Sequence, residues 1–236
     1  ALRIRRMGDR FIQTLKTRGQ FVDGAHQRQE WEWPLQQNHL DLSLLTETTV
    51  KNIADPSRLQ PIFETNFERR LVMIEQGADR IEAAFDIGEI VAGDRVRPLH
   101  EIEFELKAGD ASALLFWAQR LAQEVPVFLN LVSKAEQGYQ LAGIASPEPA
   151  VTAVPNVYGF LRLLSDCWLR QLPFPAKDVD LTLVRQAATA AGVAGDFEIL
   201  ADQLSSGFPV SELIAGGLMG RVQLSLAKVA GQEFVQ

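Results

Sequence analysis

The sequence predicts an α+β protein in which a strand-forming part is followed by a smaller helical part. Through residues 1 to 107, apolar and charged residues alternate with the period of two that is typical of strands. After about residue 155 the alternation stops, and apolar residues recur at helical spacing. Between the two parts, "ASPEPAVTAVPN" has three prolines in twelve residues, which is typical of a linker. We therefore predict domains at 1–145 and 155–236, joined by a linker at 146–154.

The first strands are predicted from short alternating runs. "LRIRR" and "FIQTLKT" are separated by Gly8 and Asp9, which are turn residues, so they predict a β-hairpin. "QRQEWEW" predicts a further strand, and Pro34 is expected to end it. Residues 41 to 60 are more helical in character, with Thr46 as the expected cap.

Longer strands follow, and then a helix. "FERRLVMI" and "RIEAAFDIGEIVAG" flank an expected turn at Gln76-Gly77, and "HEIEFEL" closes the strand region. "GDASALLFWAQRLAQEV" predicts a helix that begins at Asp110 or Ser112 and packs on the outside of the sheet. Beyond the linker, helices are expected at about 155–171, 179–191, 196–205 and 210–230.

Composition narrows the class of protein. The chain has 236 residues, 47% hydrophobic content and a formal net charge of −7, which argues against general nucleic-acid binding. Its single cysteine, Cys167, excludes a disulfide framework and a cysteine zinc cluster. The sequence shows neither a signal-peptide pattern nor an apolar run long enough for a membrane helix. We expect a cytoplasmic protein that does not bind membranes, and we keep a homo-oligomer as an open alternative to a monomer.

Each predicted strand has one strongly charged face and one bulky apolar face. The basic and acidic faces are concentrated on different strands, whereas a solvent face usually mixes both signs with Thr and Ser. The charged positions are Arg3, Arg5, Lys16, Arg28, Glu30, Glu32, Glu82, Asp86, Glu101, Glu103 and Glu105.

Two interpretations of these faces stay open at this point. An open antiparallel sheet with a salt-bridged water face would show the same alternation. A closed barrel would instead enclose both signs of charge in one cavity. In such a cavity, Arg and Lys can hold a polyphosphate, and carboxylates can hold Mg²⁺ or Mn²⁺.

The order of the motifs resembles the CYTH proteins, the triphosphate tunnel metalloenzymes. The matching segments, which lie within about residues 1 to 145, are "LRIR", "TLK", "RQEWE", "FERR", "IEAAFDIGEI", "HEIEFEL" and "SKAEQGY". Within that family, the chain is most similar to the bacterial inorganic triphosphatases. The resemblance implies an antiparallel eight-stranded β-barrel that forms a tunnel, and metal-dependent hydrolysis of tripolyphosphate to pyrophosphate and phosphate with Mg²⁺ or Mn²⁺.

The resemblance also implies roles for individual residues. The implied phosphate-binding residues are Arg3, Arg5, Lys16, Arg28, Arg69 and Lys134. The implied metal ligands are Glu30, Glu32, Asp86, Glu101 and Glu103, with Glu82 and Glu105 on the same acidic side. Lys16 and Glu103 are the expected catalytic residues. Ser133-Lys134 is expected where the last strand of the family re-enters the barrel, and Gly138-Tyr139 are expected to form a packing contact.

Two departures from the family pattern shape the functional hypotheses. The hallmark E-x-E-x-K strand belongs before "LRIR" and is absent, so we expect residues upstream of Ala1. The helical part has no histidine, so the polyphosphate-binding role of the longer CHAD domains of relatives is not transferred to it.

The first functional hypothesis is an inorganic triphosphatase. The alternatives are another tunnel enzyme, namely an adenylate cyclase or an organic triphosphate hydrolase, and a polyphosphate-binding module without turnover.

Overall fold

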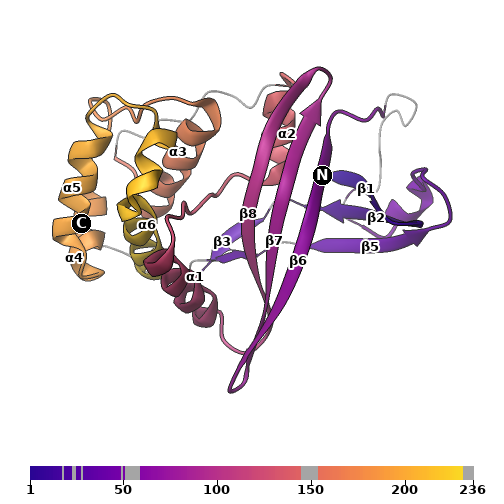
Figure 1. Cartoon of the computed structure of the whole chain (residues 1–236), viewed down its shortest axis with the longest axis horizontal. Coiled ribbons are helices and arrows are strands. Elements are labelled where there is room, and N and C mark those ends of the chain that lie inside the picture. Colours follow the sequence, from indigo (N-terminus) through magenta and orange to yellow (C-terminus); the bar gives the residue numbers. More distant parts are fainter. Residues whose placement is uncertain are drawn as a thin grey trace. The chain divides into compact units, whose positions relative to one another are not determined.

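The structure, a computed structural model, describes residues 1–17, 19–22, 25–27, 29–48, 50, 59–144 and 154–230. Contacts divide the chain into two compact units. The first unit comprises residues 1–21 and 26–61, and the second comprises residues 22–25 and 62–236. The architecture is α+β, as the sequence predicts, with strands preceding most of the helices (Figure 1).

The first unit is built on a three-stranded antiparallel sheet. Strands β1 (Leu2–Met7), β2 (Arg10–Lys16) and β5 (Glu30–Leu35) lie in the order β1-β2-β5. Gly8 has a φ of 60° in the turn between β1 and β2, a conformation that glycine adopts without strain, so the predicted hairpin is confirmed. β5 runs one residue past Pro34, because β5 is an edge strand on which a missing N–H costs no ladder bond.

The helical segment predicted at residues 41 to 60 is only partly described. The described part forms only one 3-10 turn, η1 (Leu42–Leu45). Asp41 is the N-cap of this turn, since it accepts a hydrogen bond from the Ser43 N–H, and Thr46 is the C-cap. The buried Gln13 holds the segment in place, since its side chain exchanges two hydrogen bonds with the backbone of Asp41. Residues 51–58 lie outside the described part.

The second unit contains a long three-stranded sheet. Strands β6 (Glu64–Gln76), β7 (Asp79–Ala92) and β8 (Arg95–Ala108) pair as two consecutive antiparallel hairpins. The predicted turn after Gln76 is confirmed, and Gly77 has a φ of 61° there. At Gly88 a side chain would collide with the neighbouring strand, because an added Cβ would lie 2.0 Å from the carbonyl oxygen of Asn66. This close approach brings Phe67 against the middle of β7.

Among the described residues, no set of ladders joins the strands into the closed barrel that the family resemblance implies. Strands β3 (Gln20–Val22) and β4 (Ala25–Gln27) form a separate two-stranded sheet, so the described residues make three sheets. Most ladders in the described part join strands that are consecutive in the chain. Barrel closure would need further ladders between strands that are remote in sequence, and the alternation along each strand does not specify such pairing.

The sheet of the second unit is covered by helices. α1 (Ser112–Glu124) contacts β8 and packs on α6 (Leu218–Val229), while α2 (Lys134–Leu141) contacts all three strands. Between them, the extended segment 125–132 is bonded to the later helices through two buried polar side chains. Ser165 accepts a hydrogen bond from Leu131 N–H, and Gln223 exchanges two with Leu129.

The later helices form the largest apolar core of the molecule. They comprise α3 (Val157–Arg170), α4 (Thr182–Ala190), α5 (Ala194–Leu204), η3 (Val210–Gly216) and α6, which confirms the predicted helical region (Figure 1). Phe160 and Phe197 are fully buried, and their rings meet edge to face at 5.8 Å. The linker and domain boundaries stay a prediction, since residues 145–153 lie outside the described part.

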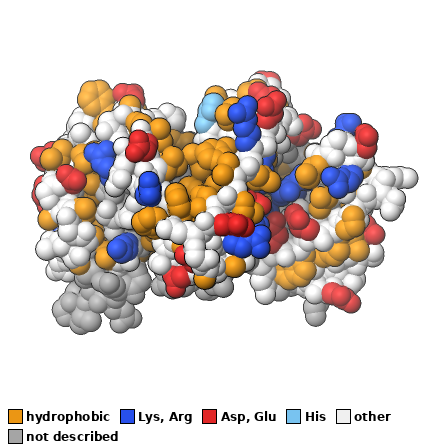
Figure 2. Space-filling model, turned by 60° about the horizontal axis from the view of Figure 1, so that its bottom comes forward, with side chains coloured by type: hydrophobic (Ala, Val, Ile, Leu, Met, Phe, Trp, Pro, Cys, Tyr) orange, Lys and Arg blue, Asp and Glu red, His pale blue; other side chains and the backbone are white. Residues whose placement is uncertain are grey.

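Some apolar surface remains exposed on the second unit. Ile87 is 60% exposed and Val96 is 56% exposed on the sheet. Figure 2 shows hydrophobic side chains gathered near the middle of the face that it draws. Across the described ranges, no helix combines the length and the apolar character that crossing a membrane requires.

Candidate functional site

One face of the β6-β7-β8 sheet carries a row of charged residues at matching register. Arg69 of β6 lies opposite Asp86 of β7, which lies opposite Glu101 of β8. Glu103 projects from the same face, because it is two residues beyond Glu101 in the strand. Sequence alternation and hairpin register thus bring together four of the predicted site residues.

Lys134 joins this row from outside the sheet, at the first turn of α2. Its ammonium nitrogen lies 2.8 Å from Glu101 Oε1, 3.1 Å from Glu103 Oε1 and 3.1 Å from Asp86 Oδ2. Its side chain is only 14% exposed. A single lysine therefore contacts three carboxylates in a setting that largely excludes water.

Arg69 forms the other cationic side of the cluster. Its guanidinium binds Asp86 in a two-pronged arrangement, with Nε and Nη2 each donating over 2.7 Å, and Nη2 also donates to Glu103 over 2.9 Å. The Phe67 ring lies beneath both cations, with its centroid 5.5 Å from Arg69 Cζ and 5.8 Å from Lys134 Nζ. We call Arg69, Asp86, Glu101, Glu103 and Lys134 the five-residue cluster.

The cluster shifts the pKa values of its members. Burial raises the pKa of Glu101, and the neighbouring charge of Glu103 adds to that effect while Lys134 opposes it. Burial also acts to raise the pKa of Glu103, but the charges of Lys134 and Arg69 outweigh it and lower the pKa to about 2. Glu103 therefore keeps its negative charge across the physiological pH range.

Both cations of the cluster are held in the protonated form. Burial acts to lower the pKa of Lys134, yet Glu101 and Glu103 outweigh it and raise the pKa above its ordinary value. The hydrogen bonds to Asp86 raise the pKa of Arg69 as well. When all five groups are ionised, two cations face three carboxylates, and the cluster carries a formal charge of −1.

The acidic row continues along the sheet beyond the cluster. Lys107 lies 2.7 Å from Glu105 and 3.6 Å from Glu82, and Glu105 is two-thirds exposed. This outer ion pair is open to solvent, so it differs from the partly desolvated cluster next to it.

The remaining predicted residues lie on the sheet of the first unit. By register, Arg3, Thr14 and Glu32 form one row across β1, β2 and β5, and Lys16 lies opposite Glu30. Lys16 Nζ is 2.8 Å from Glu30 Oε1, and Arg5 Nη1 is 3.9 Å from Glu32 Oε1. These side chains share one face, as the alternation predicts. Arg28 lies outside the described part of the chain.

The expected position of Ser133-Lys134 on a strand was wrong, because this segment starts a helix. Ser133 is the N-cap of α2 and Glu136 is the third helical residue, and together they form a capping box. The expected packing contact is present. Gly138 lies against the ring of Phe63, where an added Cβ would meet a ring carbon at 2.2 Å, and the Tyr139 ring lies edge to face with Phe63 at 5.2 Å.

Sequence reasoning missed two features that place Lys134. The S-x-x-E spacing of Ser133 and Glu136 is a sequence signature of a helix start, and it could have been recognised. Arg162 of α3, which binds Glu136, has no comparable local signal because it lies 26 residues further along the chain.

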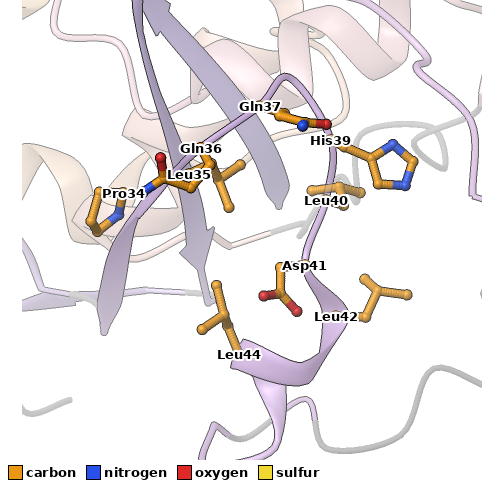
Figure 3. A pocket seen from close by; sticks show the side chains of 9 residues that line it. All are labelled: Pro34, Leu35, Gln36, Gln37, His39, Leu40, Asp41, Leu42 and Leu44. Atoms are coloured by element: carbon orange, nitrogen blue, oxygen red, sulfur yellow. The ribbon is translucent and has the colours of Figure 1, made fainter.

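A separate hollow in the first unit does not coincide with the predicted residues. It has a volume of about 610 Å³ and is lined by residues between Pro34 and Leu44, including His39 and Asp41 (Figure 3). The described residues that line it include none of the predicted phosphate or metal residues. Searched over the described ranges, the chain shows no group of three or more His, Cys, Asp and Glu residues arranged to hold a metal ion.

Comparison with known proteins agrees with the order of the motifs. A model of the CYTH domain family matches residues 1–139. The inorganic triphosphatase of Haemophilus influenzae is 37% identical over 145 aligned residues. The alignment covers 59% of this chain but only 40% of that relative, so the chain spans less than half the length of the protein it matches.

Proposed function

This chain belongs to the CYTH domain family, and we propose that it hydrolyses inorganic tripolyphosphate to pyrophosphate and phosphate with the help of a divalent metal ion. The observation that carries the proposal is the five-residue cluster, in which a lysine and an arginine from different elements converge with three carboxylates. The name of the Haemophilus influenzae relative supports the choice of substrate.

The two cations of the cluster suit a polyphosphate. Arginine donates in a planar fork that matches two phosphate oxygens, and lysine supplies a compact charge with three donors. In the described structure both cations are bonded to carboxylates, so a phosphate must compete for them. Competition is favoured because a triphosphate carries more negative charge than any one of these side chains.

The carboxylates of Glu101 and Glu103 fit a Mg²⁺ or Mn²⁺ ion by their donor chemistry. Mg²⁺ prefers oxygen ligands and usually keeps several waters, so it is bound through one or two carboxylates together with substrate phosphates. The side chains of Glu101 and Glu103 are 26% and 42% exposed, which leaves room for such waters. Asp86 stays a predicted ligand, although both of its oxygens accept hydrogen bonds from Arg69 or Lys134 in this structure.

The chemistry then divides between the metal and the side chains of this chain. When bound, the divalent ion supplies charge neutralisation and an activated water for attack on phosphorus. Arg69 and Lys134 orient the polyanion and stabilise charge that builds up on its oxygens. We propose the same binding role for Arg3, Arg5, Lys16 and Arg28, with Glu30 and Glu32 as further metal ligands.

The proposal is tested by phosphate release from tripolyphosphate, ATP and thiamine triphosphate, each measured with Mg²⁺, with Mn²⁺ and with a chelator. The full-length protein should release phosphate from tripolyphosphate fastest, and the chelator should stop the release. Release from ATP or thiamine triphosphate alone would favour an organic triphosphate hydrolase. Tight binding of tripolyphosphate with no metal-dependent release from any of the three would contradict hydrolysis and favour a binding module.

A further inference from the structure

Arg162 connects the helical region to the start of α2. It lies on α3, and its guanidinium donates to three acceptors. Nη2 is 2.8 Å from Glu136 Oε1, Nη1 is 3.2 Å from the carbonyl oxygen of Leu131, and Nε is 3.1 Å from Asp166 Oδ2. Leu131 comes before the start of α2 and Glu136 lies in its first turn. The Arg162 side chain therefore forms hydrogen bonds to the backbone before Lys134 and to a side chain after it.

The capping box explains why the hydrogen bonds of Arg162 fix the position of the start of α2. Glu136 Oε2 accepts hydrogen bonds from both the backbone N–H and the hydroxyl of Ser133, each over 2.9 Å. In return, Ser133 Oγ accepts from the Glu136 N–H over 3.2 Å. Both carboxylate oxygens of Glu136 are thus in use, one on the N-cap and the other on Arg162. Arg162 therefore binds Glu136, the residue that completes the capping box.

Lys134 is the residue between these two fixed points. As the first residue of α2, it has its backbone position set by the Ser133 cap and by the turn that Glu136 completes. Its side chain must reach three carboxylates at about 3 Å, a geometry that tolerates little displacement of the helix start. A small shift at the capping box would therefore move the ammonium group away from the cluster.

We propose that Arg162 is a positioning residue for Lys134, so that the helical region sets the geometry of the phosphate-binding lysine. The inference rests on the proposed function only in taking Lys134 to bind phosphate. A second arginine also connects α2 to α3. Arg97 Nη2 of β8 donates hydrogen bonds to the side chain of Gln140 in α2 and to the carbonyl oxygen of Leu169 in α3. Both ends of α2 are thus connected to α3.

The fork of arginine explains why this residue type is required. Its three bonds leave in different directions from one plane, and a lysine ammonium at the same place could not reach all three acceptors. The Arg162→Lys variant should therefore recover part of what Arg162→Gln loses. Arg185 provides a matched control, because it forms an exposed ion pair with Glu198 in the same helical region, at 3.0 Å.

The first experiment uses NMR to report the environment of the Lys134 side chain and does not depend on catalytic activity. The chain has six lysines, so selective ¹³C labelling of the lysine ε-carbons gives few resonances, and Lys134→Gln identifies the one that belongs to Lys134. In the substrate-free protein, Arg162→Gln should shift that resonance toward the range of the exposed lysines, and Arg185→Gln should leave it in place. An unmoved Lys134 resonance in Arg162→Gln would overturn the proposal.

The second experiment is a double-mutant cycle on tripolyphosphate hydrolysis with Mg²⁺. Arg162→Gln should lower kcat/KM about tenfold, because a small misplacement of a binding group is costly. If Arg162 acts through Lys134, the same change should have little further effect in a Lys134→Gln background. Equal losses in both backgrounds would show a merely structural role and would overturn the proposal. If the wild-type protein shows no hydrolysis, the proposed function fails, and the resonance of Lys134 still decides the positioning role.

Discussion

The two three-stranded sheets of this protein carry the same kinds of charge but arrange them differently. On the sheet of the first unit, the described ion pairs join residues of neighbouring strands, such as Lys16 with Glu30. On the sheet of the second unit, five groups converge, and the side chains of Asp86 and Lys134 are 0% and 14% exposed. The first arrangement follows from strand register alone, whereas the second also needs a residue supplied by a helix.

This difference matters for chemistry because desolvation strengthens electrostatic interactions. Exposed ion pairs contribute little to stability and are screened by salt. In the five-residue cluster, nearby charges and burial shift the pKa of Glu101 upward and the pKa of Glu103 downward, to about 2. Perturbed titration of neighbouring carboxylates is common at functional sites. The cluster is therefore the part of the molecule on which we expect function to depend most.

The largest effect is expected from Glu103→Gln, which keeps the shape of the side chain but removes its charge. Turnover of tripolyphosphate with Mg²⁺ should fall by at least about 100-fold, since a metal ligand and a partner of both cations are lost. The fold should persist because the side chain is half-exposed. Steady-state kinetics with circular dichroism checks both points, and Glu105→Gln, which alters only the outer ion pair, should lose far less.

A wild-type rate in Glu103→Gln would show that the metal assignment is wrong. A comparable loss in Glu105→Gln would instead show that the acidic row acts as a whole, so that the cluster has no special place within it.

The next largest effect concerns stability. Asp86→Asn should lower the free energy of unfolding by about 3 kcal/mol, because Asp86 is fully buried and is the shared partner of Arg69 and the mostly buried Lys134. Glu32→Gln, in the first unit, should cost less than about 1 kcal/mol, because the pair with Arg5 is long and exposed. Urea denaturation measures both. Equal losses would remove the distinction between the two sheets.

A smaller effect is expected in the pH dependence of stability. Burial acts to raise the pKa of Glu136, but hydrogen bonds from Ser133 and the charge of Arg162 outweigh it and lower the pKa. A carboxyl with a lowered folded-state pKa stabilises the protein above its unfolded pKa, near 4.3, and this contribution disappears as the pH falls through the folded value. Wild-type stability should therefore decline below about pH 4.3 more steeply than that of Glu136→Gln. Thermal melts of both proteins between pH 3 and 7, taken at steps of about one unit, measure this difference in pH dependence. Parallel profiles would mean that the charge of Glu136 contributes no stability.

Much of the fold was predictable from local patterns. Alternation placed the strands, Gly8 and Gly77 marked the hairpin turns, and helical spacing identified the later helices. Strand alternation also placed Asp86 and Glu101 on the charged faces of their strands, because the period of two is a local property, whereas Arg69 was implied by the family resemblance.

Long-range pairing was the part that local patterns did not determine. The described ladders form three sheets instead of one closed barrel, since the alternation along a strand does not say which distant strand it will pair with. The helix at Lys134 was missed because "SKAEQGY" was compared with a family strand, although its S-x-x-E spacing predicts a helix start. The contact between Arg162 and Glu136 depends on tertiary packing, and no spacing in the sequence indicates it.

The central role of the five-residue cluster is tested most directly by comparing Lys134→Gln with Arg5→Gln in the hydrolysis of tripolyphosphate with Mg²⁺. Both changes remove one predicted phosphate-binding cation, but only Lys134 belongs to the five-residue cluster. We expect kcat/KM to fall about 100-fold in Lys134→Gln and at most about tenfold in Arg5→Gln. An equal or larger loss in Arg5→Gln would contradict the claim that the cluster around Lys134 is the centre of function.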